Sequence, residues 1–284
     1  IHNTWLALRR PHHVRTLHRS SMIIELNHKG QAYTTDLSRP HDISIPLQAG
    51  PNHVRAWYLD PMRIEPVRMG DWVGAVDAGA AVNFFNIQFN PHGHGTHTES
   101  CGHITPKVHS INGVIKNFIF RALLISVKPS ATYNTNYEVM DHVITHDQMR
   151  ELIGNRKNLD AVIVRTIPND EMKVENNYSN TNPPFFEEKV VDVLNECNVI
   201  HFLTDLPSVD REIDGGRLAF HHRFWRVPEN PDMDRTITEL VYVSSEIVDG
   251  DYILEMQVAP IENDASPCRP VLYEIKTATN SDRF

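Results

Sequence analysis

A fourteen-residue segment, Asn90–His103, gathers side chains of the kinds that bind metal ions. It reads N-P-H-G-H-G-T-H-T-E-S-C-G-H and contains four histidines, one carboxylate and one thiol. These candidate ligands are His92, His94, His97, Glu99, Cys101 and His103. Neutral imidazole together with carboxylate is the ligand set of zinc and other divalent transition metals. Because histidine at this density beside a glutamate is seldom incidental, the segment predicts a metal site rather than a polar surface loop.

The backbone around these ligands is expected to be a loop that follows a strand. Three glycines and a proline within the segment exclude a regular helix. The preceding residues, Asn83–Phe89, are β-prone and partly alternating, which predicts a half-buried strand that delivers the loop to one edge of a sheet. If the chain stays extended through Gly95–Glu99, His97 and Glu99 point the same way, because successive side chains of a strand alternate.

Further ligands must come from outside this loop, and two later segments offer them. Phe220–Trp225 presents two adjacent histidines, His221 and His222, in a helix-like stretch. Thr236–Leu240 places Glu239 within a β-branched strand. A glutamate in a buried strand is costly unless it is paired or bound to metal. Because two threonines share its strand, Glu239 could equally face solvent, and the sequence leaves both readings open.

The acidic balance of the chain limits its partners. The chain has 284 residues, 40% of them hydrophobic, which suffices for one large α/β domain or two small ones. Its formal charge is −9; residues 1–21 contain four arginines and no acid, so the remainder holds 23 Lys+Arg against 36 Asp+Glu. A body this acidic is a poor partner for nucleic acid or anionic lipid. No apolar run approaches a membrane span, and a small-molecule partner is expected.

The cysteines and the first residues bear on location. Cys101, Cys197 and Cys268 are odd in number and unpatterned, which favours a reducing cytoplasm over a disulfide framework.

Residues 1–21 are rich in Arg and His and show no signal-peptide core. They could be a transit-like leader, a cloning remnant or an upstream extension. We favour the latter two and place residues 1–21 outside the fold.

The remaining chain reads as one mixed α/β domain, with helices between strands in the middle and antiparallel strands at both ends. A hairpin is predicted from Met22–Leu26 and Gln31–Asp36. Other predicted strands are Ile43–Leu47, Val54–Leu59, Trp72–Val76, Arg121–Lys128, Leu159–Ile167, Val199–Thr204, Thr236–Ser244, Asp251–Ile261 and Arg269–Ile275. A capping box at Thr145–Gln148 and a stop at Gly154 bracket one helix, and Pro184–Asn198 predicts another.

Several motifs resemble one known family. Gly95-Thr96-His97-x-Glu99-x-x-x-His103 resembles the H-x-G-T-H-x-D-x-P-x-H signature of the cyclase family, which includes bacterial kynurenine formamidase and isatin hydrolase. Asp36–Ser38 resembles the early D-L-S of that family, and Thr204–Asp210 resembles its D-x-P-S-x-D segment. With the distal histidine and glutamate, four segments occur in the right order. The resemblance extends from about Met22 to Ile275.

This resemblance implies a metal-dependent hydrolase of swivelling β/β/α fold that spans residues 22–284. It implies one or two zinc or manganese ions and a homodimer or higher homo-oligomer. His97 would be a metal ligand, Glu99 a bridging or terminal ligand, and His103 the catalytic general acid or base. The distal ligands would be Glu239 and His221, with His222 as the second choice.

The sequence departs from the family pattern at three positions of the loop. The family's first ligand corresponds to Gly93, and either His92 or His94 could replace it; we favour His92. Glu99 stands where the family has Asp, and its extra methylene moves the carboxylate. Cys101 stands where the family has Pro and could ligate a metal or pack in the core.

The leading hypothesis is therefore a hydrolase of a non-peptide amide, lactam or related acyl compound, with water activated by the metal. The best-known family activity is arylformamide hydrolysis in tryptophan breakdown. Trp225, Asp205 and Ser208 are the candidate substrate-binding residues. One alternative is a metal-dependent lyase or cyclase, and another is a non-catalytic metal-binding protein with a degenerate site. Nucleophilic catalysis by Cys101 is disfavoured, because a metal would capture its thiolate.

Overall fold

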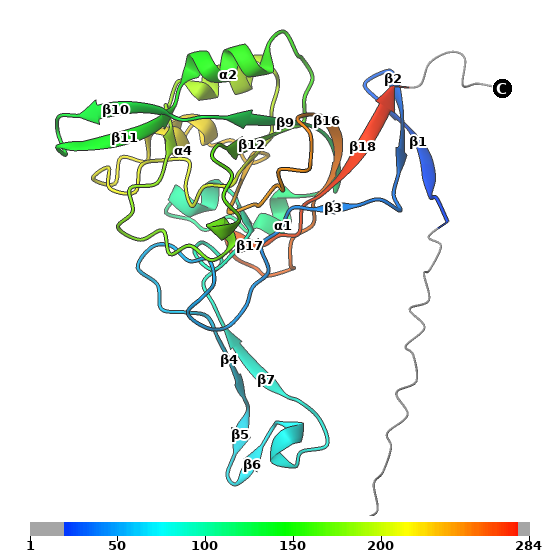
Figure 1. Cartoon of the computed structure of the whole chain (residues 1–284), viewed down its shortest axis with the longest axis vertical. Coiled ribbons are helices and arrows are strands. Elements are labelled where there is room, and N and C mark those ends of the chain that lie inside the picture. Colours follow the sequence, from blue (N-terminus) through cyan, green and yellow to red (C-terminus); the bar gives the residue numbers. More distant parts are fainter. Residues whose placement is uncertain (1–19, 278–284) are drawn as a thin grey trace, which may run out of the picture.

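The computed structural model describes residues 20–277, so the expected leader, residues 1–21, lies almost wholly outside the described residues. The chain forms a large mixed sheet with few helices (Figure 1), which confirms the predicted mixed α/β fold. Along the sheet the strands are β1 (Ile23–His28), β2 (Gln31–Asp36), β18 (Val271–Thr277), β16 (Gly250–Glu255), β9 (Ile119–Val127), β12 (Ala161–Thr166), β14 (His201–Thr204), β15 (Thr236–Glu239), β8 (His97–Glu99) and β17 (Ala265–Pro267). A short strand, β3 (His41–Asp42), pairs with β18.

Four central strands, β9, β12, β14 and β15, run parallel and have antiparallel neighbours on both sides. Every residue of β12 is buried, as expected for a parallel strand that is covered on both faces. Alternate side chains of β9 enter two different hydrophobic clusters, with Leu123 in one and Leu124 in the other. The sheet therefore separates two cores.

Helices cover both faces of this sheet. α2 (His146–Ile153), α3 (Val190–Glu196) and α4 (Ala219–Trp225) contribute to the first cluster, and α1 (Ile111–Val114) contributes to the second. The shorter 3-10 turns are η1 (Val76–Ala78), η2 (Cys101–Ile104) and η3 (Glu171–Val174). A separate three-stranded sheet contains β10 (Ser130–Asn134), β11 (Val139–Ile144) and β13 (Phe185–Phe186).

The predicted hairpin is confirmed as β1 and β2, and the capping box at Thr145 is present at the start of α2. The predicted helix over Pro184–Asn198 is wrong in its first part. Phe185 and Phe186 form β13 instead, because they pair in parallel with β11, and the helix begins only at Val190.

Other predicted strands are shorter than expected. The strand from Thr236 ends at Glu239, because Leu240 adopts a left-handed backbone conformation with φ 56°. The predicted strands Ile43–Leu47 and Val54–Leu59 contribute only isolated bridges, at Ser44 and Arg55.

The strand predicted over Asn83–Phe89 does not enter the main sheet, which corrects the expected half-buried strand. Residues Phe85–Gln88 form β7, which pairs with β4 (Arg63–Pro66) in a two-stranded ribbon that projects from the body (Figure 1). All four β7 residues are exposed. The ribbon continues into β5 (Arg68–Met69) and β6 (Trp72–Val73), and we call residues 61–90 the arm. Within residues 20–277, the helices are all too short or too polar to cross a bilayer.

Candidate metal centre

The centre of the site is β8, whose extended backbone meets the condition under which His97 and Glu99 point the same way. His97 and Glu99 lie two residues apart on this strand, and both are buried. β8 pairs antiparallel with β15, and the register places Glu239 opposite His97. Glu239 is only 3% exposed, and its Oε2 lies 3.5 Å from His97 Nε2. Of the two orientations left open for Glu239, the structure shows the inward one.

The fourth side chain of the cluster comes from α4. His221 Nε2 lies 3.0 Å from Glu99 Oε1, and His221 Nδ1 lies 2.6 Å from Asp210 Oδ2. The same Asp210 accepts the backbone N–H groups of Phe220 and His221, which fixes the start of the helix. His222 instead donates from Nδ1 to the Val227 carbonyl, at 3.0 Å. The structure therefore brings His221, and not His222, to the cluster.

His92 and His94 have different partners. His92 Nδ1 lies 3.0 Å from Glu99 Oε2, so His92 belongs to the cluster. His94 accepts the Asn90 N–H at Nδ1 and donates from Nε2 to the Asp60 carbonyl, at 2.7 and 2.8 Å. His94 thereby links the two segments at the base of the arm, at Asp60 and Asn90. Of the two histidines that could replace a ligand at Gly93, the structure brings only His92 to Glu99.

His103 projects from η2 beside this cluster. Its Nε2 lies 3.9 Å from Glu99 Oε2, and its ring stacks on that of His92 with centroids 4.2 Å apart. The His103 side chain is 32% exposed, whereas those of His97 and His221 are at most 3% exposed. His103 is therefore the histidine of this group that a diffusing molecule reaches most easily.

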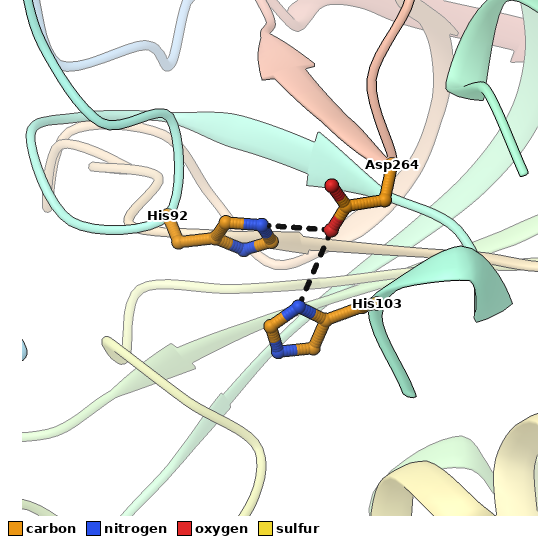
Figure 2. A group of neighbouring side chains, drawn as sticks. All are labelled: His92, His103 and Asp264. Atoms are coloured by element: carbon orange, nitrogen blue, oxygen red, sulfur yellow. Dashed lines mark hydrogen bonds and ion pairs between the residues drawn. The ribbon is translucent and has the colours of Figure 1, made fainter. Parts of the chain in front are cut away.

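Asp264 also belongs to the site, and the sequence analysis missed it. Its Oδ2 lies 2.9 Å from His92 Nε2 and 3.3 Å from His103 Nδ1 (Figure 2). Asp264 lies beside these histidines because the next residue, Ala265, begins β17, which pairs with β8 and places Ala265 opposite Glu99. No motif surrounds Asp264 in the sequence. Only knowledge of this strand pairing would have identified it.

The donor set fits a divalent metal ion. His97 Nδ1 donates to the Gly95 carbonyl, at 3.0 Å, so the lone pair of the neutral ring is at Nε2. His97 Nε2 is buried and has no hydrogen-bond partner among residues 20–277. It faces the carboxylate of Glu239, which is also an acceptor, and a cation between them would satisfy both. Three groups have ligand atoms close enough to share an ion: His92, His97 and Glu99; Glu99, His103 and His221; and His92, His103 and Asp264.

The carboxylates around the histidines favour positive charge. Burial disfavours the charged form of His92, but hydrogen bonds to Asp264 and Glu99 outweigh it and raise the pKa of His92 to about 10. Burial likewise opposes charge on His221, but Asp210 and Glu99 raise its pKa to about 10. Against its own burial, Glu99 has a pKa well below the usual value, because His103, His221 and His92 stabilise its charge. The carboxylates therefore favour positive charge at this site, whether from protons or from a metal ion.

A cavity of about 380 Å³ opens over this cluster. It is lined by Trp57, Leu59, Asn90, His92, Glu99, His103, Ser208, Leu218, His221 and Glu239. Of the three candidate substrate-binding residues, only Ser208 reaches this cavity. Trp57, which the sequence analysis did not single out, supplies the aromatic wall.

The other two candidates are buried elsewhere. Trp225 is fully buried behind His221, with ring centroids 5.3 Å apart, and donates its indole N–H to the Arg235 carbonyl. Asp205 is paired with Lys173 at 2.8 Å inside the protein. Neither side chain can contact a molecule in the cavity without rearrangement. Cys101 packs in the first hydrophobic cluster, with its sulfur 3.4 Å from that of Met233.

The fold and the buried histidine–carboxylate cluster define a candidate metal-binding enzyme. The Cyclase family model matches residues 35–211, more than half of the chain, and the chain belongs to this family. The search of curated proteins found no match.

Solved structures support the same fold. One, a potential metal-dependent hydrolase with cyclase activity, has a TM-score of 0.58 at 15% identity and covers 83% of this chain and 97% of its own. An isatin hydrolase bound to the product analogue thioisatinate has a TM-score of 0.58 at 14% identity, with coverage of 84% and 92%. Isatin hydrolase A from Ralstonia solanacearum has a TM-score of 0.57 at 17% identity, with coverage of 83% and 91%.

The adjacent histidines of α4 give a matched test of the cluster. His221→Ala should weaken Zn²⁺ or Mn²⁺ binding by more than about 100-fold, because it removes a buried group beside Glu99. His222→Ala should leave the affinity unchanged, since its ring donates to the Val227 carbonyl and does not face the cluster. Metal titration of both variants with a chelating indicator measures the difference. Equal losses in the two variants would contradict the assignment.

Metal binding should release protons. His92 and His221 hold their protons up to a pKa of about 10 in the metal-free protein, and a histidine must lose a proton to ligate. At neutral pH we expect about two protons to be released per protein, and the apparent affinity to rise as the pH rises towards 10. Calorimetry in buffers with different ionisation enthalpies counts these protons. A count of zero would mean that neither histidine is a ligand.

Proposed function

We propose that this protein is a metal-dependent hydrolase that acts on a non-peptide amide, lactam or related small acyl compound. The observation that carries the proposal is the unpartnered Nε2 of His97, which is buried and faces Glu239 beneath an open cavity. The residues that would hold one or two zinc or manganese ions are His92, His97, Glu99, His221 and Glu239. A divalent ion bound there would polarise the substrate carbonyl and activate water.

His103 is suited to move the proton in this reaction. It lines the cavity, and a carboxylate already faces its Nδ1 at 3.3 Å. Its other nitrogen is then free to accept a proton from water and to pass it to the leaving nitrogen. Imidazole does both near neutral pH. His103 would therefore act as the general acid and base.

The cavity limits the size of the substrate. Its volume of about 380 Å³ lies near the lower end of small-molecule sites. Trp57, Leu59 and Leu218 form its apolar wall opposite the polar cluster, and this suits a compound with one aromatic ring system and a carbonyl. Two of the similar structures are called isatin hydrolases, which favours a cyclic amide among the candidates.

The test is the substitution of His103. His103→Ala should keep near-normal metal content and lose about 10²–10⁴-fold in turnover, the usual loss for a general acid–base. His97→Ala should lose the metal and the activity together. Formanilide, isatin-like lactams and lactones are the substrates to assay.

Hydrolysis in water enriched in ¹⁸O should place one solvent oxygen in the product. Turnover without ¹⁸O would instead support the lyase or cyclase alternative. Metal binding without turnover of any of these compounds would support a non-catalytic protein.

We also propose that the protein forms a homodimer through the arm. Eight large apolar side chains of the arm are 37–61% exposed: Ile64, Met69, Trp72, Val76, Val82, Phe84, Phe85 and Ile87. A group of exposed apolar side chains of this size is the kind of surface that a stable complex buries, about 800 Å² per partner. Among residues 20–277, β7 pairs with β4 alone, and its other edge can pair antiparallel with β7 of a second copy across a twofold axis. The arm carries two arginines and three acids, so it lacks the basic excess of a membrane-binding segment.

Charged substitutions in β7 test this interface. Wild type should be dimeric by sedimentation velocity, and Ile87→Glu should be monomeric, because the new carboxylate would be desolvated at the interface. Val248→Glu is the control: Val248 is 74% exposed and lies outside the arm, so this variant should remain dimeric. A monomeric wild type that sediments with phosphatidylcholine vesicles would instead assign the arm to lipid.

A further inference from the structure

One carboxylate oxygen of Asp264 faces two histidines of the site at once. Oδ2 lies 2.9 Å from His92 Nε2 and 3.3 Å from His103 Nδ1 (Figure 2). The two rings stack, with centroids 4.2 Å apart and an angle of 30° between their planes. Asp264 thus touches both a candidate ligand and the candidate proton-transfer residue, at ring nitrogens other than those that face Glu99.

The position of Asp264 is fixed by the fold. Its carbonyl accepts the Ser100 N–H at 3.0 Å, which ties its backbone to the turn that carries His103. Gly102 lies close against it: a Cβ at Gly102 would be 3.2 Å from Asp264 Cβ and 2.5 Å from the His109 nitrogen. The Asp264 side chain is only 14% exposed. Its orientation towards the two rings is therefore a property of the packing.

This contact determines which ring nitrogens carry protons. An ionised carboxylate only accepts hydrogen bonds, so the nitrogens that face Asp264 must be N–H groups. The lone pair of a neutral His92 is then at Nδ1, which faces Glu99 Oε2 at 3.0 Å. The lone pair of a neutral His103 is at Nε2, which faces the same oxygen at 3.9 Å. Both lone pairs are directed to the same side of the site.

We propose that Asp264 is a positioning residue that sets the tautomers of His92 and His103 together. Through His92 it prepares a metal ligand, as carboxylates behind ligating histidines do in other metal sites. Through His103 it leaves the cavity-facing nitrogen ready to accept a proton. This inference rests on the function proposed above for the catalytic role of His103, but its effect on the tautomers and on metal affinity does not require a substrate.

Three variants test the assignment. Asp264→Asn keeps the shape and removes the charge, and its amide can present an N–H where the carboxylate only accepted. Asp264→Glu keeps the charge and should restore part of the effect. Glu262→Gln is the matched control, because Glu262 lies two residues away and bonds Asn112 instead of the histidines. Circular dichroism melts establish that each variant is folded.

The first measurement is ¹⁵N NMR of histidine-labelled protein, with His103 assigned from the signals that His103→Gln lacks. In metal-free wild type, His103 should be protonated at Nδ1 in its neutral form. In the zinc-loaded wild type, His92 should retain the proton at Nε2. Asp264→Asn should give a mixture of tautomers at His103, and Glu262→Gln should resemble wild type.

The second measurement is zinc titration. Asp264→Asn should weaken the affinity by about 10- to 100-fold without changing the number of ions bound, the usual effect of losing a carboxylate behind a ligand. On any substrate found, kcat should fall more than KM rises. Unchanged tautomers and affinity in Asp264→Asn would overturn the proposal. Loss of one bound ion would also overturn it, since Asp264 would then be a ligand. If wild type hydrolyses nothing while the tautomer and affinity changes appear, the proposed function fails and the positioning role stands.

Discussion

The site depends on one buried contact between two hydrogen-bond acceptors. The lone pair of a neutral His97 at Nε2 faces the carboxylate of Glu239, 3.5 Å away. Two acceptors that face each other in a buried place cost free energy, and a cation between them removes that cost. Glu99 adds a second buried carboxylate, and His221 is held against it by Asp210. Without a metal, protons on His92 and His221 compensate the negative charge, because the facing carboxylates raise the pKa of both rings to about 10. The cluster therefore has the donor atoms with which a metal ion could replace these protons.

Strand register is what brings these groups together. β8 lies between β15 and β17, so three segments far apart in the chain contribute Glu99, Glu239 and Asp264 to one place. The backbone hydrogen bonds between paired strands fix where each side chain lies. If the pairing of a strand shifted by one residue, its side chains would point to the other face of the sheet. Another side chain of the cluster, His221, comes from α4, whose first turn is bound by Asp210. Strands and helical turns therefore position most of the cluster, whereas His92 and Asp264 lie in the turn and bend just outside such elements.

The sequence predicted those site residues that lie together in one motif or on one strand. The alternation at His97 and Glu99 was readable because both lie on one strand. Asp264 was not readable, because its role follows only from the pairing of β17 with β8. The arm was misread for a related reason: the apolar pattern of Asn83–Phe89 is the same whether a strand enters the core or remains exposed. The proximity of Trp225 to His221 in sequence likewise said nothing about which side of the helix faces the cavity.

Gly93 stands where the family pattern has its first metal ligand, and His92 lies directly before it. A side chain at Gly93 would be crowded, because its Cβ would lie 3.0 Å from the Ala56 carbonyl oxygen and 2.5 Å from Leu59 Cδ1, so the Leu59 side chain would have to move. In the resemblance to the family this position holds the first ligand, and the neighbouring His92 lies with its Nδ1 3.0 Å from Glu99 Oε2. A histidine that approaches from an irregular turn needs a partner to fix its ring, and Asp264 is in contact with its far nitrogen. Two carboxylates, Glu99 and Asp264, thus hold the His92 ring at its two nitrogens.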